Sequence, residues 1–166
     1  MSKPVLILFG TQSGNSEDLA SRLAKSATTH NLTPTVVDME NATVEQMASS
    51  ERILIICSTW GEGDMPDSAE ALWDLISAED APKMENTNFS VCALGDTSYE
   101  FYCQSGKDWD NRLEEMGATR IHDRVDCDVD YEPPWKSWVP TALGSLAAID
   151  ESNNFHENLV STFAEM

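Results

Sequence analysis

The amino-acid sequence predicts an α/β fold, in which a five-stranded parallel sheet carries helices on both faces. Two observations support this prediction. Strand-like and helix-like patterns alternate along the chain, as in proteins built from successive strand–helix–strand units. Two of the strand-like segments, 5–9 and 53–57, are unbroken apolar runs, which is typical of strands buried on both faces of a parallel sheet. At 166 residues, the chain is long enough to bury the core of one such domain.

The first half of the chain contains three predicted strands, at residues 5–9, 33–38 and 53–57. The second of these strands is less apolar and contains a proline, so we expect it at the edge of the sheet. Apolar residues at helical spacing predict helices at residues 16–29, 44–48 and 67–78.

The second half contains two further predicted strands, at residues 89–95 and 119–125, and two helical regions, at 107–116 and 133–149. Gly117 is expected to end the first of these helices as a C-cap. Pro140 and Gly144 interrupt the second region, so the sequence leaves open whether it forms one helix or two.

We interpret residues 1–150 as one domain and residues 151–166 as a C-terminal tail. In the tail, Phe155, Leu159 and Phe163 recur every four residues, which predicts an apolar stripe on a short helix. We expect this helix to dock on its own domain or to fray, and binding of a partner is the alternative.

The chain is strongly acidic, with 29 acidic and 10 basic residues and a formal net charge of -19. Nucleic acids and anionic membranes would repel it, so neither is an expected partner. Such acidity suits either solubility or attraction to a basic partner protein, and the charge alone does not distinguish these roles.

Four cysteines occur, and none is spaced as in a CxxC motif or as a set of metal ligands, so no metal site is expected. Cys57 and Cys92 lie in apolar runs, where we expect buried thiols of a reducing compartment. The sequence begins without a signal-peptide pattern and contains no apolar run of transmembrane length. We therefore expect a cytoplasmic protein.

Small polar residues fill the loop after the first strand, which reads Gly-Thr-Gln-Ser-Gly-Asn-Ser from residue 10 to residue 16. Free N–H groups at the start of the following helix, together with the helix dipole, favour a bound anion such as a phosphate. The loop contains no lysine or arginine, so it is not the P-loop of an ATPase. A helix start capped by Ser13 or Asn15, without any ligand, is the alternative.

Aromatic residues appear in the loops after the third and fourth strands. Trp60 lies in the first of these loops, and Tyr99, Phe101 and Tyr102 lie in the second. Ligands of such sheets bind outside the carboxyl ends of the strands. The three loops together therefore predict a pocket for a flat ring joined to a phosphate. The alternatives are that Trp60 packs into the local core and that Phe101 or Tyr102 packs beneath its own loop.

With these three loops in this order, the chain resembles the flavodoxin family. Within that family it is similar to the FMN-binding module of the diflavin reductases, most of all to the flavoprotein of sulfite reductase. The resemblance covers residues 4–149, and the fifth strand lacks the long insertion of long-chain flavodoxins, as in the short-chain members. It implies a flavodoxin-like sheet with strand order 2-1-3-4-5 and FMN as the cofactor.

The resemblance also implies which residues bind FMN. They fall into three groups: Thr11, Gln12, Ser13, Gly14, Asn15 and Ser16; Ser58, Thr59, Trp60 and Gly61; and Leu94, Gly95, Asp96, Thr97, Ser98, Tyr99, Glu100, Phe101, Tyr102 and Cys103. The first group would hold the phosphate. Trp60 and Tyr99 would flank the isoalloxazine ring, and Tyr102 is the alternative to Tyr99.

The implied function is that of an FMN-containing, low-potential electron carrier, which shuttles single electrons from a separate reductase to an acceptor enzyme. The expected donor is an NADPH-dependent flavoprotein reductase, and the expected acceptor is a redox protein with a basic docking surface. Diflavin reductases continue into FAD- and NADPH-binding domains, whereas this sequence stops at Met166. We therefore expect a monomeric electron-transfer flavoprotein that is not an enzyme and has no catalytic residues of its own.

Acidic residues in and near the three loops suit a low reduction potential, because like charges disfavour the anionic reduced flavin. These residues are Asp64, Asp67, Asp96, Glu100, Asp126, Asp128 and Asp130.

The sequence lacks the motifs of two other protein classes that share this type of fold. A phospho-receiver needs clustered aspartates after the first strand and another after the third, and a low-molecular-weight phosphatase needs a cysteine and an arginine in its phosphate loop. Neither pattern is present. An FMN-dependent quinone reductase and an interaction module that does not bind FMN remain as alternatives.

Overall fold

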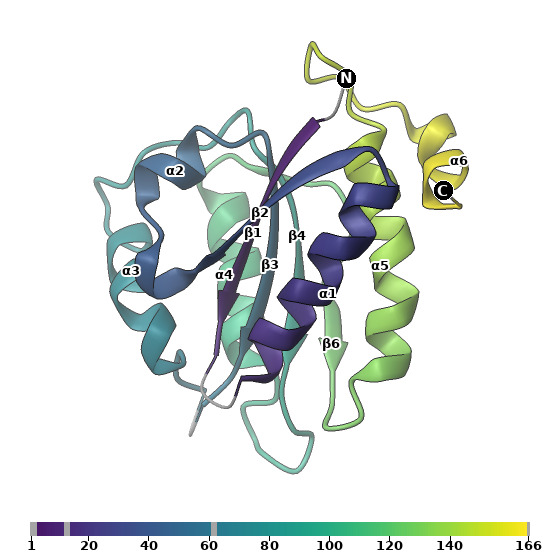
Figure 1. Ribbon diagram of the computed structural model, residues 1–166. Coiled ribbons are helices and arrows are strands. Elements are labelled where there is room, and N and C mark those ends of the chain that lie inside the picture. Colours follow the sequence, from purple (N-terminus) through teal and green to yellow (C-terminus); the bar gives the residue numbers. More distant parts are fainter. Residues whose placement is uncertain (1–2, 12–13, 61–62, 166) are drawn as a thin grey trace.

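The computed structural model describes residues 3–11, 14–60 and 63–165 and contains one parallel sheet (Figure 1). Its strand order is β2-β1-β3-β4-β5, and β6 also pairs with β4, so the predicted fold class and strand order are confirmed. The strands are β1 (Lys3–Gly10), β2 (Leu32–Asp38), β3 (Arg52–Ser58), β4 (Asn88–Leu94), β5 (Thr119–Arg120) and β6 (Val125–Cys127).

The apolar runs form the centre of the sheet because their side chains are buried on both faces. β1 pairs with β3, with Leu6 opposite Ile53, and β3 pairs with β4, with Ile55 opposite Val91. These four side chains are at most 5% exposed. β2 lies at the edge, as its weaker apolar character and its proline predict.

Helices cover both faces of the sheet (Figure 1). α1 (Asn15–Thr29) and α5 (Glu132–Ala147) pack over one face and share one apolar core cluster. On the other face, a second cluster includes residues of α2 (Val44–Ala48), α3 (Glu70–Ile76) and α4 (Gln104–Glu115). Single 3-10 turns occur at Met39–Asn41 and Asp67–Ala69. One apolar layer therefore covers each face of the sheet, and the ends of the strands are left for a binding site.

The fifth predicted strand differs from expectation because it is divided into β5 and β6. Arg120 and Arg124 both pair with the buried carboxylate of Asp110 in α4, at 2.7 Å and 2.8 Å. Arg120 lies in β5 and Arg124 immediately precedes β6, so the two ion pairs tie both short strands to α4, and each strand pairs separately with β4.

The last helical region is one helix, α5, although Pro140 lies inside it. Proline removes one helical hydrogen bond, but Trp138, Val139, Ala142 and Leu143 on either side are all buried. Burial of both flanking turns keeps the helix continuous. α4 begins at Gln104, three residues before its predicted start, and Gly117 follows it with φ +95°, as expected for a C-cap position.

Residues after α5 fold back over the amino end of the sheet and over α5. They contain a 3-10 turn (Glu157–Leu159) and α6 (Val160–Ala164), which packs against α5. Gly144 allows this close approach, since a Cβ there would lie 2.8 Å from the backbone of α6. Asn88 also donates a hydrogen bond to Asn153 at 2.8 Å. In the described part of the chain, every helix is too short or too polar to cross a membrane.

Candidate functional site

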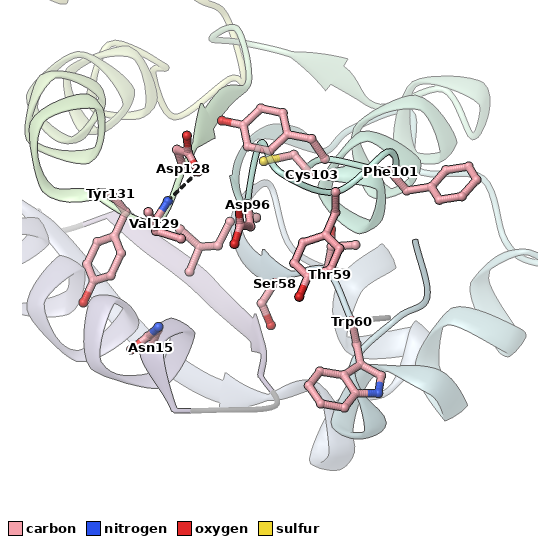
Figure 2. A pocket seen from close by; sticks show the side chains of 14 residues that line it. Asn15, Ser58, Thr59, Trp60, Asp96, Phe101, Cys103, Asp128, Val129 and Tyr131 are labelled. Atoms are coloured by element: carbon pink, nitrogen blue, oxygen red, sulfur yellow. Dashed lines mark hydrogen bonds between the residues drawn. The ribbon is translucent and has the colours of Figure 1, made fainter. Parts of the chain in front are cut away.

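The carboxyl ends of β1, β3, β4 and β6 meet at one edge of the sheet, and the loops that follow them surround a cavity of about 420 Å³ (Figure 2). Its size lies within the range of roughly 300–1,000 Å³ for small-molecule and cofactor sites. The lining residues are Asn15, Ser58, Thr59, Trp60, Leu94, Gly95, Asp96, Tyr99, Phe101, Tyr102, Cys103, Asp128, Val129 and Tyr131.

The loop after β1 leads into α1 without a side-chain cap. Gly14 is the N-cap residue, with φ +93°, so the helix is not capped by Asn15. The N–H of Gly14 donates to Thr11 Oγ1 at 2.7 Å, and the first helical hydrogen bond runs from the Asp18 N–H to Gly14 O at 3.1 Å, so the N–H groups of residues 15–17 have no partners within the helix. Ser16 Oγ is buried and has no hydrogen-bond partner among the described residues. Gln12 and Ser13 lie outside the described residues. This helix start can therefore accept an anion.

The loop after β3 holds Trp60 out of the core. Its backbone N–H donates to Asp64 O at 2.9 Å, and the Asp64 N–H donates to Trp60 O at 2.8 Å. Thr59 Oγ1 accepts a hydrogen bond from the Ser105 N–H at the start of α4. The Trp60 side chain is 53% exposed, so it does not pack into the local core. Gly61 lies outside the described residues.

The loop after β4 carries an exposed aromatic residue at its tip. Asp96 organises the tip, because its carboxylate accepts hydrogen bonds from the N–H and the hydroxyl of Ser98, and its carbonyl accepts from the Tyr99 N–H. Tyr99 is 64% exposed and Phe101 is 40% exposed. The loop therefore leaves Tyr99 and Phe101 accessible at the cavity, with the Phe101 ring directed away from its centre (Figure 2).

Tyr102 and Cys103 lie deeper in the same loop. The Lys107 ammonium is 5.7 Å from the centre of the Tyr102 ring. Burial, and then the neighbouring Cys103, raises the pKa of Tyr102, and burial raises the pKa of Cys103 to about 12. Both groups are neutral near pH 7, so the Cys103 thiol is not an activated nucleophile.

The cavity brings together residues from all three predicted groups. Six other predicted residues are described but do not line it: Thr11, Gly14, Ser16, Thr97, Ser98 and Glu100. Figure 2 shows Asn15 and Tyr131 on one side of the cavity and Trp60 on the other.

Three lining residues, Asp128, Val129 and Tyr131, were missing from the predicted binding residues. They follow β6. In the sequence, Asp128 and Tyr131 contribute to the likeness to the flavoprotein of sulfite reductase, and Asp128 counts among the acidic residues near the loops, but no binding role was predicted for any of the three. Their place after a fifth strand, at the same edge as the other loops, was the signal that could have identified them.

Comparison with known proteins identifies relatives of this chain. It matches the family described as Flavodoxin over residues 7–138. Among solved structures, a flavodoxin from Streptococcus pneumonia superposes with a TM-score of 0.78 at 21% identity, covering 87% of this chain and 98% of that one. At this identity, the structural likeness supports the fold alone.

Curated relatives share more sequence. The sulfite reductase (NADPH) flavoprotein alpha-component of Bacillus subtilis is 43% identical over 146 residues, which cover 88% of this chain and 24% of the relative. The protein of the same name from Salmonella typhimurium is 43% identical over 148 residues, covering 87% of this chain and 25% of the relative. The chain thus spans about a quarter of the length of these relatives, and the predicted resemblance is confirmed.

The expectation that the chain is not an enzyme is wrong, whereas a role in electron transfer agrees with the family and with the relatives. Its relatives are named as a component of a reductase, so its sequence is similar to that of one module of an enzyme. The physical reason is that the fold and the loops of such a module are the same whether it acts alone or beside further domains. The residues of the module therefore do not distinguish a carrier from part of an enzyme.

Proposed function

The chain belongs to the flavodoxin family, and on this premise we propose that it passes single electrons from an NADPH-dependent flavoprotein reductase to a redox acceptor protein. FMN is the cofactor of this family. Bound FMN supplies an isoalloxazine ring that accepts and releases electrons. The observation that carries the proposal is that one cavity is lined both by the start of α1, which has no side-chain cap, and by exposed aromatic side chains.

Residues 11–16 are proposed to bind the FMN phosphate. The support is the chemistry of the helix start, where N–H groups without helical partners and a positive dipole end favour an anion. The buried Ser16 hydroxyl, which has no partner among the described residues, adds a donor that a phosphate oxygen would satisfy. Burying this hydroxyl without a partner would otherwise carry a desolvation cost.

Residues 58–61 and 94–103 are proposed to hold the ring. Trp60 and Tyr99 are large aromatic side chains that remain more than half exposed beside a cavity, and such surfaces favour a flat apolar ligand. Leu94 and Cys103 also line the cavity, are buried, and supply apolar surface there. Covering the ring in this way would exclude water from its faces.

Carboxylates around the cavity are proposed to keep the reduction potential low. Asp96 and Asp128 line the cavity directly, and negative charge there opposes additional negative charge on the ring. Asp126 contributes less negative charge than its position in the sequence suggests, because Arg124 Nε lies 2.7 Å from its carboxylate and offsets its charge.

The partners follow from the charge and from the relatives. A net charge of -19 favours a basic docking surface on the acceptor, and the names of the curated relatives include NADPH. We retain residues 1–150 as the FMN-binding domain and residues 151–166 as a docked tail, since α6 packs against α5. The four buried free thiols support a reducing, cytoplasmic setting.

Titration of the purified protein with FMN and with FAD tests the proposed cofactor site. We expect one FMN per chain, bound without a covalent bond, and no comparable binding of FAD. A protein that binds neither flavin would overturn the proposal and favour an interaction module.

Stopped-flow electron transfer tests the proposed partners. Rates with a basic acceptor should fall as the salt concentration rises, because exposed charges are screened beyond about 8–10 Å at physiological ionic strength. Rates that do not depend on salt would contradict the proposed electrostatic docking. Rapid reduction of a quinone by NADPH, with this chain alone as the catalyst, would favour a quinone reductase.

A further inference from the structure

Asp128, the first residue after β6, ties two segments of the cavity wall together. Its Oδ1 accepts hydrogen bonds from the Thr97 N–H at 3.0 Å and from the Val129 N–H at 2.8 Å. Its Oδ2 accepts a hydrogen bond from the Thr97 hydroxyl at 2.6 Å. Figure 2 shows the bond to Val129 at the rim of the cavity. The Thr97 hydroxyl, and then the two N–H groups, lower the pKa of Asp128, so its carboxylate is ionised at neutral pH.

The loop tip held by Asp128 is shaped by hydrogen bonds of its own. Within it, Asp96 accepts the hydrogen bonds from Ser98 and Tyr99 described above. Those bonds shape the tip but do not attach it to the sheet. At its base, the Gly95 N–H donates to Cys127 O at 2.9 Å, and at the tip Asp128 holds Thr97. Both attachments lead to the end of β6.

Contacts with neighbouring side chains restrain Tyr99 only weakly, because Tyr99 is mostly exposed. Its position over the cavity therefore depends on the position of the tip that carries it. We infer that Asp128 is a positioning residue for the proposed flavin site, in which it latches the 96–99 tip to the end of β6 so that Tyr99 lies over the ring. This inference rests on the proposed function.

A latch and a simple charge predict opposite effects of replacing Asp128. FMN carries a negative phosphate, so removing a nearby negative charge strengthens flavin binding if charge alone matters. If the carboxylate is a latch, removing it weakens binding, since the tip loses both of its hydrogen bonds to Asp128. Asparagine retains an oxygen that can accept from the Thr97 N–H and an amide that can donate to the Thr97 hydroxyl. Asp128→Asn should thus keep most of a latch while losing the charge.

The experiment measures dissociation constants for FMN and riboflavin by quenching of flavin fluorescence. We expect Asp128→Ala to weaken both flavins by about three- to tenfold, the scale of a charge-assisted hydrogen bond that solvent partly screens. The affinities for FMN and riboflavin should fall by the same factor, because the latch positions residues around the ring, which both flavins share. Asp128→Asn should restore most of the affinity. The visible circular dichroism of bound flavin should change in Asp128→Ala, because the ring environment changes.

Asp130→Ala is the matched control, since it removes an exposed carboxylate two residues away that does not line the cavity. It should bind both flavins as tightly as the wild type, or more tightly. Thr97→Val removes the hydroxyl side of the latch but keeps the Thr97 N–H bond, so it should weaken both flavins in the same direction as Asp128→Ala and by less. The double variant should bind no more weakly than Asp128→Ala alone, because the bond lost in Thr97→Val is already lost in Asp128→Ala.

Several outcomes would overturn the inference. They are unchanged or tighter flavin binding by Asp128→Ala, equal effects of Asp128→Ala and Asp130→Ala, and additive effects in the double variant. A loss confined to Asp128→Ala, accompanied by a lower urea midpoint of the flavin-free protein and absent in Thr97→Val, would also overturn it by indicating general destabilisation. A wild-type protein that binds neither flavin would overturn the proposed function together with the latch, whereas the other outcomes leave the proposed function standing.

Discussion

Glu132, the first residue of α5, accepts two hydrogen bonds from Arg22 of α1, with Nη1–Oε1 and Nη2–Oε2 distances of 2.7 Å and 3.1 Å. The Arg22 guanidinium also lies 4.5 Å from the centre of the Trp135 ring. Asn15 begins α1, Tyr131 immediately precedes α5, and both line the cavity. The bidentate pair therefore joins α1 and α5, the two helices that start beside the cavity.

This ion pair predicts a specific loss of stability in acid. The hydrogen bond from Arg22 lowers the pKa of Glu132 from 4.5 to about 2. A carboxyl group with a lower pKa in the folded state contributes stability above its unfolded pKa and loses it as the pH falls toward the folded pKa. The urea midpoint of Glu132→Gln should thus lie below that of the wild type at pH 7. The difference should shrink between about pH 4.5 and pH 2, and a difference that stays constant over that range would contradict the prediction.

The close approach of α4 to β4 at Gly106 leaves no room for a side chain there. A Cβ at Gly106 would lie 2.2 Å from Ala93 Cβ, far inside van der Waals contact. Gly106→Ala gains about 1 kcal/mol of helix propensity, but overpacking typically costs about 1–3 kcal/mol, and so severe an overlap lies at the upper end. We expect a net decrease in the free energy of unfolding, measured by denaturant titration. The double variant with Ala93→Gly should recover part of it, and a stable Gly106→Ala variant would show that α4 can shift freely.

Gly14 predicts a difference between FMN and riboflavin. Its φ of +93° strains any residue with a side chain, although no atom lies within 4 Å of the added Cβ. Gly14→Ala should therefore reorient the backbone N–H groups at the start of α1 without crowding. We expect FMN affinity to fall by about tenfold, the scale of such backbone strain, and riboflavin affinity to change much less. Equal losses for both flavins would show that this loop is not the phosphate site.

Tyr99 and Tyr102 predict unequal roles in covering the ring. Tyr99 is exposed beside the cavity, whereas Tyr102 is half-buried and lies against Lys107. Tyr99→Ala should weaken FMN binding by about 1–3 kcal/mol, the range for burying one large side chain. Tyr102→Ala should weaken it less. If fluorescence titration shows the reverse order, Tyr102 is the second wall of the ring site.

Local patterns predicted most of the fold and the edge at which the site lies. The apolar runs at 5–9 and 53–57 became the buried strands β1 and β3 because only a sheet covered on both faces removes every side chain of such a run from water. Parallel strands then place the loops after them at one edge, whatever the details of packing. Trp60 and Tyr99 were therefore expected beside one cavity, and both line it.

Contacts between distant parts of the chain decided the rest. The division of the last strand depends on Arg120 and Arg124 converging on Asp110, and the continuity of α5 through Pro140 depends on burial against the sheet. The latch from Asp128 to Thr97 joins residues 31 positions apart. Periodicity and turn chemistry describe only neighbours in sequence, so they carry no information about which carboxylate meets which donor. By itself, the sequence determined the sheet and its functional edge, and the tertiary structure decided how the walls of the cavity are held in place.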